Sequence, residues 1–421
     1  MSRAPWWSRL FGQAPTPPPA AEPPPGPAKV RLPRNAAAEL PAGALRRPLI
    51  GRDGQVAAFE WLLADAARRP LADQQALWAA AAAAPWPALV TLPVRRARDS
   101  AVQAALAPGL WLLLDELPDA ALATALRACG VQLGAPAGVP VAEPALDFVV
   151  ATAAGGGTDT LLLAGQRWHE AQPRVHLVAL GLTSLDDAEQ LLARGYHWAG
   201  GRLARAKAAA ATATQPLGAA AHRICALLSQ LAQDADTAPL AAAVRADVAL
   251  GYRLLRYANS PAVGLRTPAD TVEQAIAVLG RRELTRWLQV LLLAAAASRP
   301  AQRALQQHTL MRARLLERLA ERRGEPEPGA FFTLGLMSTL EQLLRVPLAT
   351  VVAPLRLREE AQLALLQGRG PWAGQLVLLE ALEDPDESRA WAAAAALGHG
   401  AELSDEAEAA WAWASGVDAG G

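Results

Sequence analysis

The pattern of hydrophobic residues changes character near Pro216. From Arg46 to about Ala208, short apolar segments alternate with alanine-rich stretches of helical periodicity. Strands that alternate with helices are typical of a parallel sheet or barrel, in which each crossover runs through a helix. After Pro216 the strand signals disappear, and apolar residues recur at helical spacing. We therefore expect an α/β unit followed by an all-α unit, and 421 residues are enough for both.

The first unit is expected to contain several short elements. The expected strands are 57–63, 89–92, 111–114, 148–151, 161–164 and 175–180, and the expected helices are 73–84, 119–128 and 184–194. The glycine run 155–157 lies between two of these strands and lacks the Lys-Ser/Thr of a phosphate-binding loop. We interpret it as a flexible turn.

Two helices of the second unit have recognisable ends. The first helix carries an apolar stripe with alternating steps of four and three residues, formed by Val244, Val248, Gly251, Leu255 and Ala258. Asn259 is expected to end this helix in the left-handed conformation, ahead of Pro261. The second helix is expected to begin near Asp270, with Glu273 completing a capping box, and to end at Gly280.

Charge and cysteine content restrict the classes of partner and compartment. The chain has 40 basic and 40 acidic residues, so it lacks the positive field that favours nucleic acid. We therefore expect no nucleic-acid partner. Cys129 and Cys225 fit no zinc, haem or redox spacing, and we interpret them as buried thiols in a reducing compartment. These observations predict a cytoplasmic protein.

No segment has the pattern of an export signal or a membrane span. Residues 1–12 lack a continuous apolar core. The apolar runs 76–94 and 288–297 are interrupted by proline or too short for a bilayer of roughly 30 Å. Residues 1–44 are rich in proline and alanine and predict a disordered tail and linker. Trp6 and Trp7 are interpreted as part of a frayed tail, the alternative being contact with a membrane surface or a partner groove.

The segments 247–260 and 271–280 carry an ordered set of motifs. An aspartate precedes a helix that ends in Leu-Leu-Arg-Tyr-Ala-Asn-Ser, and a second helix reads Thr-Val-Glu-Gln-Ala-Ile-Ala-Val-Leu-Gly. This set strongly resembles the HDOD domain, and further matches extend the resemblance over residues 212–400. The resemblance implies an all-helical, HD-related domain that acts as a docking or output module. The motif residues, expected to be structural or to contact a partner, are Asp247, Leu254, Leu255, Asn259, Ser260, Ala275, Ile276, Leu279 and Gly280.

A second resemblance covers residues 45–208. Arg47 and Pro48, followed by Glu60 and Leu62, resemble the first hairpin and strand of an EAL domain, and residues 185–195 resemble its closing helix and turn. This resemblance implies a TIM-barrel-like fold. Because complete eight-unit barrels use roughly 200–250 residues, we expect an incomplete or degenerate barrel. An EAL-like module followed by an HDOD module resembles a class of bacterial signalling proteins.

The EAL resemblance also implies a two-metal site. Active members of the family place several carboxylates, an asparagine and a lysine around two divalent cations that activate water on cyclic di-GMP. The corresponding strands here, 91–93, 132–136, 148–151 and 178–181, contain no carboxylate. Glu60, Asp115 and Glu116 are too few to hold two Mg²⁺ or Mn²⁺ ions. We therefore expect no hydrolysis, and we interpret Glu60 as a solvated or hydrogen-bonded strand-end residue.

The second half is likewise expected to lack a metal pair. No His-Asp dipeptide occurs in the sequence, and none of the six histidines has another at helical ligand spacing. His308 is interpreted as a surface residue. Ser260 and Ser338 have no nearby histidine in the sequence, so a hydrolase triad is unsupported. The tryptophans are interpreted as core residues. Residues 401–421 are expected to form an acidic tail, a solvated helix with Trp411 and Trp413 on one side.

Two functions remain open at this point. The first is a non-catalytic signalling protein, whose HDOD module binds other signalling proteins of unknown identity beside an EAL-like module that has lost its phosphodiesterase residues. The second is a catalytically dead receptor that still binds cyclic di-GMP or a related nucleotide. We expect no cofactor and no bound metal in either case. The sequence leaves a homodimer open.

Overall fold

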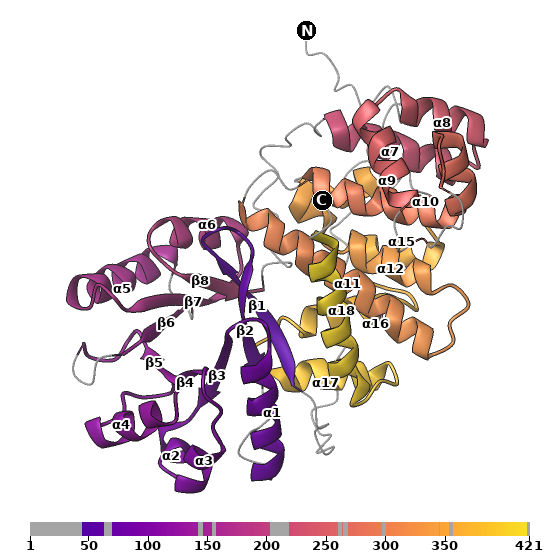
Figure 1. Cartoon of the computed structure of the whole chain (residues 1–421). Coiled ribbons are helices and arrows are strands. Elements are labelled where there is room, and N and C mark those ends of the chain that lie inside the picture. Colours follow the sequence, from indigo (N-terminus) through magenta and orange to yellow (C-terminus); the bar gives the residue numbers. More distant parts are fainter. Residues whose placement is uncertain are drawn as a thin grey trace, which may run out of the picture.

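The chain folds into a barrel formed by residues 45–201 and a helical region formed by residues 219–418 (Figure 1). The computed structural model describes residues 44–62, 70–141, 146–153, 157–202, 219–259, 263, 268–296, 300–344, 346–352 and 357–418. The predictions for residues 1–43 and for Ser260 therefore concern residues outside these ranges. The predicted order, an α/β unit followed by an all-α unit, is confirmed.

Eight strands close the barrel in the order in which they occur along the chain. Strand β1 is antiparallel to both of its neighbours, β2 and β8, whereas all other neighbouring strands are parallel. The strands are β1 (Leu45–Gly51), β2 (Val56–Leu62), β3 (Ala88–Leu92), β4 (Trp111–Leu114), β5 (Gln132–Pro136), β6 (Phe148–Thr152), β7 (His176–Leu182) and β8 (Trp198–Gly201).

The barrel is complete in strands, so the expectation of an incomplete barrel is wrong on this point. Its short length has two sources. The strands have only four to seven residues, and the described residues between β5 and β6 contain no helix. The outer helices are α1 (Leu71–Ala83), α2 (Val94–Ala97), α3 (Ser100–Ala105), α4 (Ala120–Ala128), α5 (Thr158–Ala171) and α6 (Leu185–Ala193).

Several elements of the barrel differ from the expectations. The expected strand 161–164 lies inside α5, where Leu161, Gly165 and Trp168 form a buried stripe at helical spacing. Strands β5 and β8 were not predicted from the residue pattern. Both contain glycine, and β5 also contains proline, and these residues carry weak strand signals. The strands form because neighbouring strands pair with them on both sides.

Apolar side chains fill the barrel interior. They are Leu49, Ala58, Leu89, Phe148, Val150, Val178, Leu180 and Trp198, with Trp111 and Leu113 packed against them. The Phe148 ring packs against Gly134 of β5. Only glycine leaves enough space there, because a Cβ at Gly134 would lie 2.3 Å from the ring. The interior is therefore a packed core, as in other barrels of this size.

We expect Gly134→Ala to destabilise the barrel by about 1–3 kcal/mol, because the added methyl group overpacks the interior against Phe148. Gly138→Ala is the matched control, since a Cβ at Gly138 meets nothing within 4 Å. Urea unfolding followed by circular dichroism measures both variants. Adding Phe148→Leu to the Gly134 variant should recover part of the loss. Equal stability of the two alanine variants would contradict this account of the interior.

The helical region contains twelve helices among its described residues. They are α7 (Ala219–Ala232), α8 (Thr237–Arg245), α9 (Val248–Ala258), α10 (Val272–Ala296), α11 (Pro300–Arg322), α12 (Pro328–Met337), α13 (Leu340–Leu344), α14 (Leu348–Val352), α15 (Glu359–Gln367), α16 (Ala373–Ala381), α17 (Glu387–Ala396) and α18 (Glu402–Asp418). None of the helices that the structure describes combines the length and the apolar character needed to cross a bilayer.

The face that α9 buries differs from the expected stripe. Val248 is 85% exposed, while Leu250, Gly251, Leu254 and Ala258 face the core. Val248 is the first residue of the helix, because Asp247 caps it by accepting a hydrogen bond from the Leu250 amide. The buried face differs from the predicted stripe because the spacing of apolar residues alone does not fix where a helix begins.

The ends of α9 and α10 confirm the expected positions and correct the expected chemistry. Asn259 follows α9 with φ −86°, so it is not left-handed. Its side-chain amide instead pairs with both backbone groups of Ala269, at 2.9 and 2.7 Å. The capping box of α10 consists of Thr271 and Gln274, one residue beyond the expected pair. Gly280 has φ +69° and interrupts α10, as its expected role as a stop requires.

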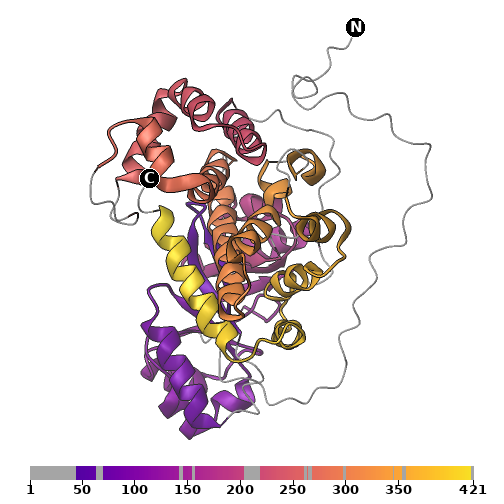
Figure 2. The same cartoon turned by 90° about the vertical axis from the view of Figure 1, so that its right-hand side faces the viewer.

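Helices α11 and α18 lie against the hairpin formed by β1 and β2 (Figures 1 and 2). The Ala304 amide of α11 donates to the Gly54 carbonyl in the hairpin turn at 3.0 Å. The Ser404 hydroxyl of α18 pairs with both backbone groups of Ala44. The barrel therefore packs directly on the helical region through its first two strands.

The final helix is an integral part of this contact, so the expectation of a solvated tail is wrong. In α18, Trp411 is only 2% exposed, and its ring meets Phe59 of β2 edge to face at 4.9 Å. Glu406 is buried and pairs with Arg318 and Arg322 of α11. The acidic composition of the segment suggested a solvated helix, but one face of α18 packs on both the barrel and α11.

Candidate functional site

The carboxyl ends of the parallel strands meet at one end of the barrel, where barrel enzymes carry their active sites. Side chains two residues apart on a strand lie on the same face of the sheet. Glu60, Thr91 and Thr152 therefore point to the barrel interior, like the core residues that precede each of them by two positions, Ala58, Leu89 and Val150. Asp115 follows β4 at the same end. We refer to this end of the barrel as the mouth.

The carboxylates at the mouth already have structural partners. Glu60 lies directly opposite Arg47 in the β1–β2 register, and the two form a buried ion pair of 2.5 Å. Asp115 accepts a hydrogen bond of 2.7 Å from the Val94 amide at the start of α2. The hydrogen-bonded alternative in the interpretation of Glu60 is therefore confirmed, and the solvated one is not.

Divalent metal ions do not fit this mouth. Mg²⁺ and Mn²⁺ select several oxygen ligands, chiefly carboxylates. Here Glu60 is neutralised by the Arg47 guanidinium, and the neighbouring strand ends present Thr91 and Thr152. Among the residues described, no group of three or more His, Cys, Asp or Glu side chains could hold a metal ion.

A turn of the helical region contributes two further acids to the mouth. Glu383 and Asp384 follow α16, and both are buried. The Glu383 carbonyl accepts a hydrogen bond from Arg47 at 3.3 Å, and Asp384 pairs at 2.8 Å with Arg202, which follows β8. Strands β1 and β8 pair to close the barrel. Both are thus bound to the helical region through arginine side chains.

The same turn is anchored on its other side by the helical region itself. The Glu383 carboxylate pairs with Arg312 of α11 at 2.6 Å, and Asp384 pairs with Arg389 of α17 at 2.5 Å. Arg312 also donates to the Ser338 hydroxyl. A chain of polar contacts therefore runs from Glu60 through Arg47 to the Glu383 backbone carbonyl, and from the Glu383 carboxylate to Arg312 of α11.

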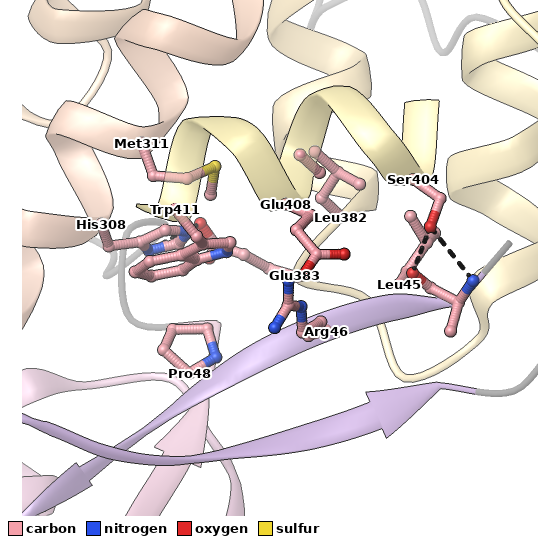
Figure 3. A pocket seen from close by; sticks show the side chains of 12 residues that line it. Leu45, Arg46, Pro48, His308, Met311, Leu382, Glu383, Ser404, Glu408 and Trp411 are labelled. Carbon is pink, nitrogen blue, oxygen red and sulfur yellow. Dashed lines mark hydrogen bonds and ion pairs between the residues drawn. The ribbon is translucent and has the colours of Figure 1, made fainter. Parts of the chain in front are cut away.

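His308 lies beside this chain of contacts, so its interpretation as a surface residue is wrong. It is buried, and its ring stacks on that of Trp411 with centroids 5.5 Å apart and an interplanar angle of 5° (Figure 3). Its Nδ1 is 3.8 Å from a Glu383 carboxylate oxygen. Burial, aided by the positive charge of Arg312, lowers the pKa of His308 to about 3. The imidazole is therefore neutral at physiological pH.

A small cavity separates His308 from the barrel. It has a volume of about 20 Å³ and is lined by Arg46, Pro48, Glu383 and Trp411 among others (Figure 3). Arg46 forms an ion pair of 3.1 Å with Glu408 at its edge. A cavity of this size has room for about one water molecule and for no nucleotide.

The two histidines at the opposite end of the barrel lie together without forming a metal site. The rings of His176 and His197 are 4.3 Å apart, beside Trp111 and Trp198. His197 Nδ1 accepts the Leu177 amide hydrogen. Burial, followed by the charges of Arg52 and neighbouring histidines, lowers the pKa of His197 to about 4. Sequence spacing gave no sign of this pair.

The motif residues that the structure describes lie on α9 and α10 or cap α9, away from the mouth. Leu254, Ala275 and Ile276 are buried, and Leu255 and Leu279 are partly buried against the same core. Asp247 and Asn259 serve as caps and clamps of the backbone. Of the residues singled out in the barrel, Arg47 and Glu60 lie at the mouth, and Pro48 lines the small cavity beside His308. Leu62 is the last residue of β2.

We expect Arg47→Met to lower the free energy of unfolding by about 3–5 kcal/mol, because the Glu60 carboxylate would then be buried without its cation. The double variant Arg47→Met, Glu60→Leu removes both charges and should be markedly more stable than the single variant. Urea unfolding of the three proteins measures the difference. A double variant as unstable as the single one would show that the two side chains are not coupled.

Acid should destabilise the protein partly through His308. The unfolded chain protonates this residue near pH 6.5, whereas the folded chain does so only near pH 3, so stability is lost as the pH falls through this window. Between pH 7 and pH 5.5 the loss from this residue should be about 1 kcal/mol. His308→Phe keeps the stacking on Trp411 and should lack this loss. Parallel urea unfolding curves at both pH values provide the measurement, and an identical pH dependence of the two proteins would contradict the assignment.

Comparisons with known proteins find a family match within the helical region. Residues 216–362 match the family model of the HDOD domain. The uncharacterized protein YuxH of Bacillus subtilis (strain 168) is 28% identical over 142 residues, which cover 33% of this chain and 35% of that protein. The cyclic di-GMP phosphodiesterase CdgJ of Vibrio cholerae serotype O1 is 28% identical over 144 residues, 34% of this chain and 33% of that protein. The aligned part of this chain thus spans about a third of the length of each curated relative.

A solved structure of an EAL domain protein from Listeria monocytogenes EGD-e aligns with a TM-score of 0.29 and 11% identity, over 37% of this chain and 84% of that one. A TM-score this low says nothing about the residues of the site. The predicted limits 212 and 400 of the HDOD module stay predictions, since the family match spans 216–362. Residues 216–362 of this chain match the HDOD domain family, and they follow a closed eight-stranded barrel.

Proposed function

We propose that this chain is a non-catalytic signal-transduction protein of cyclic di-GMP signalling, in which the HDOD domain binds other signalling proteins and the barrel serves as its scaffold. The observation that carries the proposal is the ion pair between Arg47 and Glu60. In this pair the Glu60 carboxylate makes a structural contact. An EAL-type hydrolase would need a metal ligand at this position. The name of the relative CdgJ supports the signalling context alone.

The contact between the barrel and the helical region supports a scaffolding role for the barrel. The turn at Glu383 and Asp384 engages Arg47 and Arg202 at the mouth. The same turn is bound by Arg312 of α11 and Arg389 of α17, so a rearrangement of the mouth is coupled to these helices through the turn. Such coupling suits a barrel that sets the orientation of a binding module.

The HDOD domain presents an exposed apolar strip that suits a protein partner. On α9, Val248 and Tyr252 lie one turn apart and are 85% and 65% exposed. Arg253 and Arg256, on the same helix, are charged neighbours of this strip. This pair of exposed apolar side chains offers a partner a small hydrophobic contact on α9.

The alternative is a receptor that binds cyclic di-GMP without cleaving it. The arginines at the mouth favour it, because guanidinium groups bind phosphates and the buried Arg47 Nε has no hydrogen-bond partner. Binding would require phosphate to displace Glu383 and Asp384 from these arginines. The two functions therefore make opposite predictions for nucleotide binding.

Calorimetry and chromatography of the full-length protein with cyclic di-GMP and Mg²⁺ or Mn²⁺ separate the two functions. We expect no turnover and no heat of binding at micromolar nucleotide, because the mouth lacks ligands for metal and its arginines are engaged. Binding without turnover would establish the receptor instead, and turnover would refute both. The Arg202→Ala variant tells whether any binding uses the mouth.

Affinity capture with the full-length chain tests the role of the HDOD domain. A partner that binds the wild type should be lost with Tyr252→Glu, because a charge would interrupt the apolar strip. Leu163→Glu, at a residue of α5 that is 68% exposed, is the matched control on the barrel and should retain the partner. A partner that tolerates Tyr252→Glu and is lost with Leu163→Glu would place the binding surface on the barrel.

A further inference from the structure

A cavity of about 250 Å³ lies within the helical region, away from the barrel mouth. It is lined by residues of α7, α10, α12 and the start of α15, with Trp372 at its side, and it opens to solvent beside Arg358 and Glu327. Its volume exceeds the roughly 150 Å³ of a core cavity that binds benzene. The pocket therefore has room for a small bicyclic molecule.

The walls of the cavity are mainly apolar. Leu228, Leu231 and Ala232 face it from α7 at helical spacing, and Ala330 and Ala361 face it from the other side. The Trp372 ring packs on Phe331 with centroids 4.4 Å apart, so this wall is fixed by its neighbours. These surfaces suit an apolar ligand body.

Two charged residues line the cavity, and they cancel each other. Arg358 pairs with Glu327 at 2.8 Å and with Glu360 at 3.4 Å, and it lies over the Trp372 ring at 5.5 Å. Because its charge is already balanced, the site has no excess charge for an anionic or cationic ligand. The electrostatics therefore favour an uncharged molecule.

One polar side chain within the cavity is poorly satisfied. Gln289 of α10 is only 4% exposed, and its amide contacts the Thr333 hydroxyl at 3.4 and 3.5 Å. The single hydrogen of that hydroxyl has a better acceptor in the Gly329 carbonyl, at 3.1 Å. Gln289 Oε1 is thus left with a weak contact, although buried acceptors are costly when they lack a donor.

We propose that this cavity binds a small, uncharged, mainly apolar molecule that donates one N–H or O–H hydrogen bond to Gln289 Oε1. The apolar walls hold the ligand body, and Gln289 selects the donor group. This site is independent of the barrel mouth, so the proposal goes beyond the proposed function and stands or fails separately from it.

Indole and indene are suitable probes, because they share a bicyclic shape and only indole carries an N–H donor. Titration of the full-length protein by calorimetry should show that indole binds about tenfold more tightly than indene, the difference expected for one hydrogen bond to a buried acceptor. The methyl NMR signals of Leu231 and Thr333 should shift on addition of indole.

Two variants make the test specific to the cavity. Gln289→Leu keeps the volume of the side chain and should abolish the preference for indole over indene. Ala330→Leu narrows the cavity and should weaken binding of both probes, and circular dichroism verifies that each variant is folded.

The proposal is overturned if indole fails to bind, if it binds the Ala330→Leu protein as well as the wild type, or if its preference survives in Gln289→Leu. Should either variant fail to fold, the wild-type comparison of indole with indene and the location of the shifted methyl signals decide the question. Equal affinities, or shifts confined to residues outside the cavity, count against the site.

Discussion

Strand β1 has no helix of its own, because a hairpin turn connects it to β2, and the helical region covers it. Most of the parallel strands are connected through helices, but a hairpin turn brings none. Phe59 on this hairpin is buried by Trp411, which lies more than three hundred residues further along the chain. The barrel is therefore completed by α11 and α18, and the two modules share one continuous core.

Charged residues at this shared contact are stable because each is buried with an opposite charge. Glu60 faces Arg47, and Glu383 faces Arg312, at hydrogen-bonding distance. Removing charges from water is expensive, and such pairs are tolerated only when geometry and hydrogen bonds compensate for desolvation. At the barrel mouth the same arrangement engages the Glu60 carboxylate, and the Arg47 guanidinium links the barrel to the turn at Glu383 in the helical region.

The local pattern was sufficient for several regular elements. Apolar segments predicted β3, β4, β6 and β7, and the signals at Asp247 and Gly280 predicted where helices begin and break. Tryptophans such as Trp78 and Trp168 are core residues, as expected. The pattern failed for β5 and β8, whose glycines have weak strand propensity and whose pairing depends on neighbouring strands.

The sequence by itself determined the order of the two modules, the ends of several helices and the scarcity of carboxylates on the strands that lead to the barrel mouth, because these depend on residue type and short spacing. Only the tertiary structure decided that His308 is buried against Trp411 and that Arg47 joins Glu60 to the turn at Glu383. The charge state and burial of a side chain depend on the groups around it, and here those groups come from distant parts of the chain.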